Sequence, residues 1–69
     1  MDAVEKELAS RKENIKKEML FLFKANMKFT DWDIPEADDE KSAKLLLDII
    51  KETIDEIEQD INDGKYKDY

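Results

Sequence analysis

The fold is decided by residues 43–61, AKLLLDIIKETIDEIEQDI. Apolar residues recur here at alternating intervals of four and three, the spacing of one face of an α-helix. The stripe consists of Ala43, Leu47, Ile50, Ile54, Ile57 and Ile61. Gly64 follows it and suits a C-cap, because glycine adopts a left-handed backbone conformation without steric cost. The sequence predicts an amphipathic helix that ends at about residue 62 and leaves a short tail, 64–69.

The start of this helix has two solutions. The run Asp33-Ile34-Pro35-Glu36 has the Asp-x-x-Glu spacing of a capping box, which starts the helix at about residue 36. Asp38 or Asp39 could cap the helix instead, which then begins near Glu40.

A second apolar stripe predicts another helix over about residues 2–28. It consists of Val4, Leu8, Ile15, Met19, Leu22 and Phe29, and is interrupted by Arg11 and Asn26. The loop between the helices, about 30–38, is short, which favours antiparallel neighbours. We therefore expect residues 1–69 to form a single all-α domain, an antiparallel two-helix hairpin.

One hairpin seam cannot cover all the apolar residues. The surplus lies near the expected loop end and consists of Leu20, Phe21, Phe23, Met27, Trp32, Leu45 and Ile49. We expect Trp32 and Ile34 to fold back from the loop over one side of the helix pair. The other side forms a partner or oligomer interface, because exposed together these residues exceed the patch that a monomer tolerates. A homodimer that forms a four-helix bundle is the leading prediction, and a different protein partner is the alternative.

Composition excludes several classes of site. The 69 residues contain no cysteine, which rules out a disulfide framework, a thiolate metal site and a cysteine nucleophile. They contain no histidine, the commonest general base. We predict no catalytic, cofactor-binding or metal-ligating residue, and a protein that is not an enzyme. The longest apolar run, 19–23, is too short to span a bilayer, and no secretory signal opens the chain, so we expect a cytoplasmic location.

Charge is divided unevenly along the chain. Residues 1–29 carry a net +2 and residues 30–69 a net −9, giving −7 in total. An acidic face is expected on the second helix, formed by Asp48, Glu52, Asp55, Glu56, Glu58 and Asp60. It would repel nucleic acid and anionic lipid but attract a basic protein. The predicted function is a small interaction module, such as a regulator, inhibitor, antitoxin or immunity protein. The abundance of Ile, Lys, Asp and Glu suits an AT-rich microbial or phage genome.

Two other hypotheses come from the acidic residues. A calcium loop starting at Asp31 lacks the glycine and the final glutamate that such loops need. The pairs Glu36-x-x-Asp39 and Glu52-x-x-Asp55 resemble the paired acidic motifs of all-α nucleotide pyrophosphohydrolases of the MazG type, which bind Mg²⁺ between helices. The resemblance covers these four residues and implies an oligomeric, metal-dependent hydrolase as the alternative function. A structural subunit of a larger assembly is a third.

Overall fold

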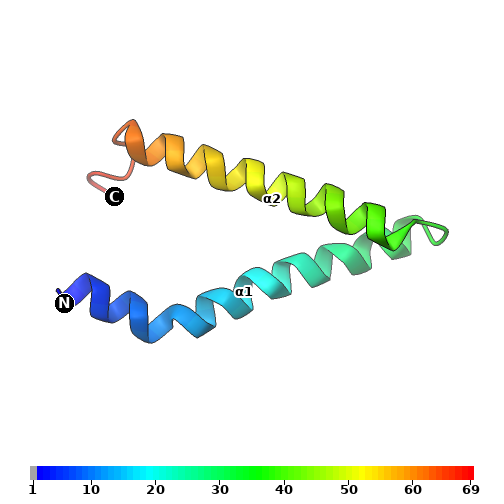
Figure 1. Cartoon of the computed structure of the whole chain (residues 1–69), viewed down its shortest axis with the longest axis horizontal. Coiled ribbons are helices and arrows are strands. Elements are labelled where there is room, and N and C mark those ends of the chain that lie inside the picture. Colours follow the sequence, from blue (N-terminus) through cyan, green and yellow to red (C-terminus); the bar gives the residue numbers. More distant parts are fainter. Residues whose placement is uncertain (1) are drawn as a thin grey trace.

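The computed structural model describes residues 2–69 and consists of two antiparallel helices joined by a short loop (Figure 1). Helix α1 spans Ala3–Asp33 and helix α2 spans Asp39–Asn62. Residues 2–69 contain no strand, and Met1 lies outside the described part. The prediction of an all-α helical hairpin is confirmed.

Both helices begin at an aspartate. The Asp2 carboxylate accepts a hydrogen bond of 2.7 Å from the backbone N–H of Glu5. The Asp38 carboxylate accepts bonds of 3.0 and 3.2 Å from the N–H groups of Glu40 and Lys41. Each cap satisfies donors that have no partner inside the helix. Asp38 is therefore the cap of α2, and the later of the two predicted starts is correct.

The first helix runs five residues beyond the expected end at residue 28. It stops at Ile34, whose backbone leaves the helical region with φ −134° and ψ 82°. Pro35 explains this, because a proline disfavours helical geometry in the residue before it. The expected capping box at 33–36 does not start a helix, since Asp33 is still the last residue of α1. Residues 30–33, expected in the loop, are helical, and the loop contains only residues 34–38.

The C-terminus of α2 closes as its glycine predicts. Gly64 has φ +81°, in the left-handed region. The N–H of Gly64 bonds to the carbonyl of Ile61 at 3.0 Å, and the N–H of Lys65 bonds to the carbonyl of Asp60 at 3.0 Å. These two bonds form a Schellman motif, which satisfies carbonyls at the helix end. A turn then brings Tyr66 and Tyr69 edge to face, with ring centroids 5.4 Å apart.

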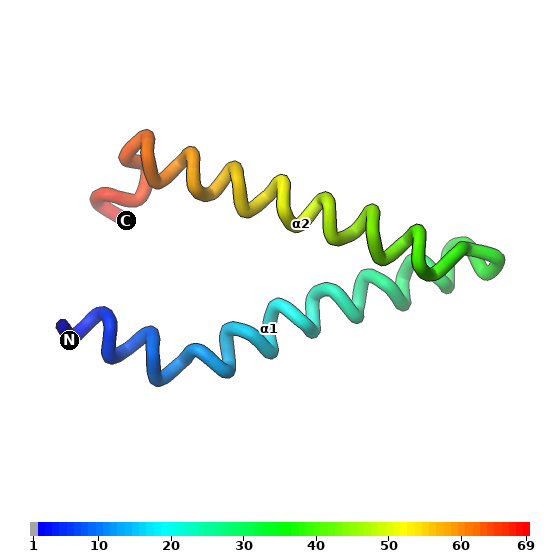
Figure 2. The backbone as a smooth tube through the Cα atoms, in the orientation of Figure 1, coloured from blue at the N-terminus to red at the C-terminus, as the bar shows by residue number. Residues whose placement is uncertain are grey.

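The two helices lie close together at the loop and separate towards the termini (Figure 2). The half-buried residues follow this shape: apart from Asp60 they all lie between Phe23 and Ile50, and no residue in 2–69 is fully buried. The radius of gyration is 16.0 Å, against about 11 Å for a globular chain of this length. The hairpin therefore has a contact at one end and an open wedge at the other.

The sequence of α1 explains why the two helices separate towards the termini. At about 100° per residue, Val4, Leu8 and Ile15 lie roughly 100° around the helix from Phe23 and Met27. Phe23 and Met27 are half-buried and belong to the contact near the loop. In the first half of α1, Lys12 and Lys16 occupy the positions on that same side. Because lysine ammonium groups resist burial, α1 cannot continue its contact with α2 towards the N-terminus.

Candidate protein-interaction groove

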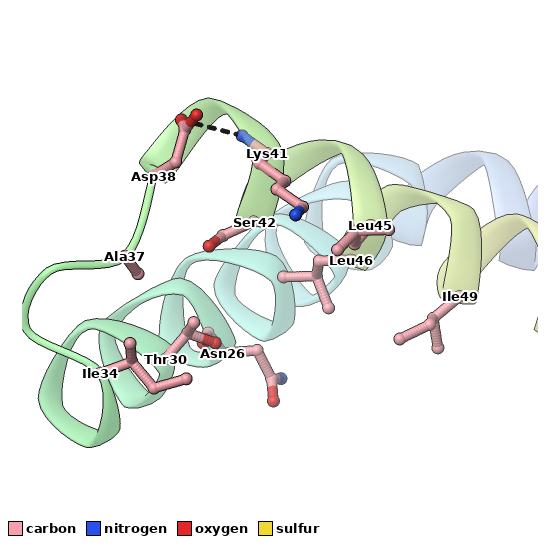
Figure 3. Close-up of a pocket in the computed structure, with 10 residues that line it drawn as sticks. All are labelled: Asn26, Thr30, Ile34, Ala37, Asp38, Lys41, Ser42, Leu45, Leu46 and Ile49. Carbon is pink, nitrogen blue, oxygen red and sulfur yellow. Dashed lines mark hydrogen bonds between the residues drawn. The ribbon is translucent and has the colours of Figure 1, made fainter.

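A groove runs along one side of the hairpin, between α1 and α2 (Figure 3). Near the loop it is lined mainly by Asn26, Thr30, Ile34, Ala37, Ser42, Leu45, Leu46 and Ile49. It continues towards the wedge along Met19, Leu22, Ile50, Thr53, Ile54 and Ile57. Asn26, Leu46 and Ile49 line both parts, so the two parts are continuous. Both helices thus contribute to a single long apolar surface.

Three polar residues in the groove direct their hydrogen bonds back onto their own helices. The Asn26 side chain donates to the Leu22 carbonyl at 2.8 Å, and Thr30 donates to the Asn26 carbonyl at 3.0 Å. Thr53 donates to the Ile49 carbonyl at 2.9 Å. A threonine whose hydroxyl donates to its own helix turns its methyl group outward and needs no further acceptor for its hydroxyl proton. The groove is therefore more apolar than its residue types indicate. Such a surface can bind the apolar face of another helix.

Charged side chains line the groove only at its loop end. Asp38 and Lys41 stand at this rim, joined through the backbone N–H of Lys41 (Figure 3). Lys44 and Glu40 form an exposed ion pair of 3.3 Å one turn further on. An apolar floor with a polar rim is typical of protein–protein interfaces.

The predicted interface residues occupy four different places. Leu45 and Ile49 line the groove and are 54% and 60% exposed, whereas Phe23 and Met27 are half-buried. Phe21 and Trp32 line a separate shallow pocket of α1, together with Lys24, Ala25, Lys28 and Phe29. Leu20 is 55% exposed and lines neither surface. Their role as an interface stays a prediction.

Trp32 does not fold back over the helix pair. It belongs to α1, is 73% exposed and packs edge to face on Phe29, with ring centroids 6.0 Å apart. That expectation was wrong because Trp32 lies before the helix end, on the side of α1 that carries Phe29 one turn earlier. Ile34 does reach the groove and lines its loop end.

The residues expected to form an acidic face all lie in α2. Asp48, Glu52, Asp55, Glu56 and Glu58 are all exposed. Asp60 is half-buried, and Lys65 pairs with it at 3.0 Å. Within residues 2–69 the only other ion pair is Glu40–Lys44, so the five exposed carboxylates have no cation partner there. This face can attract a basic surface.

The paired acidic motif is not assembled in this hairpin. Glu36 lies in the loop, Asp39 is the first residue of α2, and Glu52 and Asp55 lie three to four turns further along that helix. No three metal-ligating side chains within residues 2–69 are grouped so that they could hold one ion. Within the same residues, no helix is both long enough and apolar enough to cross a membrane.

Two carboxyl groups do approach each other beside the loop. Hydrogen bonding with Asp39, followed by slight desolvation and by repulsion from its charge, raises the pKa of Asp31 above its ordinary value. Asp31 lies in the last turn of α1 and Asp39 in the first turn of α2. The helix dipole favours a negative charge at Asp39 and disfavours one at Asp31.

Comparison with known proteins found no match to this chain among protein-family models, curated proteins or solved structures.

Proposed function

We propose that this chain is a small, acidic, non-enzymatic protein–protein interaction module that assembles as a symmetric dimer, a four-helix bundle closed over the groove. The supporting observation is its exposed area of 6,428 Å². A folded monomer of 8.2 kDa exposes about 4,500 Å². The hairpin thus exposes about 1,900 Å² more than a self-sufficient fold of its mass.

The same relation between the mass and the exposed area of a folded protein indicates how much surface a dimer would cover. A globular particle of twice this mass exposes about 7,500 Å², so pairing two hairpins would remove about 5,300 Å² in total. Obligate homodimers bury about 2,000–5,000 Å² or more. The area that a compact dimer would cover therefore lies at the upper end of the range for obligate homodimers.

A dimer closed over the groove leaves much of the acidic face on the outside. Asp48 and Glu58 lie roughly 100–180° around α2 from the groove residue Ile49. They carry no ion pair within the hairpin, and a basic protein would bring them cations. Association would be fast and salt-dependent, because a charged face steers encounter from a distance. Regulation or inhibition of a larger basic protein is the role that this face supports best.

The test of the groove is a matched pair of substitutions. Ile49→Ser places a hydroxyl in the groove, whereas Leu20→Ser changes an equally exposed residue outside it. Loss of one buried Ile side chain costs roughly 2 kcal/mol, and it is lost from both copies. We expect the dissociation constant of the Ile49→Ser dimer to rise by two to three orders of magnitude.

Light scattering after gel filtration measures this effect, and circular dichroism verifies that both variants stay helical. The Leu20→Ser protein should elute with the mass of the unmodified chain. Equal masses for the two variants would show that the groove is not the interface.

A further inference from the structure

We propose that the second copy packs on the groove with its loop at the same end, so that each α1 lies on the partner's α2. This inference rests on the proposed dimer and adds its orientation. Its basis is the charge at the open end of the hairpin.

Opposite charges collect on the two helices at this open end. Residues 6–17 of α1 carry a net +3, and residues 48–60 of α2 carry a net −5. Both segments lie towards the end where the chain termini are found (Figure 1). Within residues 2–69 the only ion pair that involves either segment is Asp60–Lys65. The wedge keeps the two segments apart within one chain, so these charges are available to another copy.

Symmetry leaves two ways of stacking the same face of two hairpins. With the two-fold axis along the helices, both loops lie at one end, and each α1 rests on the partner's α2. With the axis across the helices, the loops lie at opposite ends, and like helices rest on each other. Both arrangements cover the same groove, so apolar contact does not distinguish them.

Charge separates the two arrangements. When the loops share an end, the +3 segment of each copy lies along the −5 segment of the other, and this happens twice. When the loops are opposed, α2, with a net charge of −5 over residues 39–62, lies on a second α2. Like charges in register oppose association, and complementary ones set its register. The arrangement with both loops at one end is therefore favoured.

Charge reversal with complementation tests this contact. The variant Lys12→Glu/Lys16→Glu/Lys17→Glu makes the basic segment acidic. The variant Glu52→Lys/Asp55→Lys/Glu56→Lys makes the acidic segment weakly basic. Each homodimer should dissociate on the order of tenfold more readily at low salt.

Mixing the two variants should restore a tight heterodimer, because both of its α1–α2 contacts join opposite charges. Molar salt should shrink these differences, since it shortens the screening length to about 3 Å. If the charged segments instead pair within one chain, mixing rescues neither variant, and native mass spectrometry finds no selective heterodimer.

A distance measurement reads the orientation directly in the otherwise unmodified chain. The protein has no cysteine, so Glu36→Cys in the exposed loop takes a single spin label. Loops at one end should place the two labels well within half of the 49 Å long axis of the hairpin. Loops at opposite ends separate the labels by about that whole length.

The outcomes distinguish this inference from the proposed function. A labelled protein that stays monomeric at every concentration contradicts both. A dimer with distant labels leaves the proposed function standing and overturns the orientation.

Discussion

Gly64 ends α2 through its backbone alone. A Cβ at this position would meet no atom within 4 Å, so space does not demand glycine there. The φ of +81° at this position requires glycine, because residues with a Cβ are strained in the left-handed region.

We expect Gly64→Ala to lower the free energy of unfolding by about 1 kcal/mol. Gly64→Asn is the matched variant and should lose less, since asparagine tolerates this conformation. Thermal unfolding followed by circular dichroism measures both changes. An alanine variant as stable as the unmodified chain would mean that the Schellman motif contributes nothing.

The raised pKa of Asp31 makes a pH-dependent prediction. The hydrogen bond between protonated Asp31 and Asp39 stabilises the fold. This contribution is fully present below the unfolded-state pKa of Asp31 and is lost as pH rises through its higher folded-state pKa. At neutral pH the ionised carboxyl is repelled by Asp39. Asp31→Asn should therefore raise the melting temperature slightly at pH 7, and this gain should vanish in acid.

The control for Asp31→Asn is Asp33→Asn, which removes one charge from the same last turn of α1. Melting curves from pH 7 into the acid range compare the three proteins. A gain for Asp31→Asn that stays constant with pH, or an equal gain for the control, would contradict the role of Asp39.

Among the elements, the course and the C-terminus of α2 were predictable. Its start was left between two positions, and the end of α1 was not predicted. The stripe of α2 stays in phase along its length, and both Asp38 and Gly64 mark its ends with their own chemistry. The end of α1 has no such cap. It depends on the effect of Pro35 on Ile34, which local apolar periodicity does not reveal.

This origin of the α1 end can be tested by Pro35→Ala. We expect helical chemical shifts to spread into Ile34, and the free energy of unfolding to fall by about 0.5–1 kcal/mol as the loop gains freedom in the unfolded state. Nuclear magnetic resonance and denaturant unfolding measure these effects. Unchanged shifts at Ile34 would mean that the loop contacts, and not the proline, stop the helix.

The groove was only partly predictable for a related reason. Leu45 and Ile49 were expected to be exposed, but Phe23 and Met27 were expected on the same footing and are half-buried. One apolar stripe was expected along the whole of α1. The apolar residues of its first half in fact lie on a different side of the helix from Phe23 and Met27. Only the pairing with α2 shows that Lys12 and Lys16 take the place of apolar residues in the wedge.

At the scale of the whole molecule, the hairpin is a fold without an interior. No residue in 2–69 is fully buried, and the long axis measures 49 Å for an 8.2 kDa chain. Such a small chain gains little stability without further burial. In the proposed dimer, a second copy over the groove would supply that burial, and the charged segments at the open end would set its orientation.

Sedimentation equilibrium of the unmodified chain, from low to high micromolar concentration, tests this account most directly. We predict a mass that approaches twice 8.2 kDa as the concentration rises, with helix content increasing in parallel. A stably helical particle of 8.2 kDa at every concentration would contradict it.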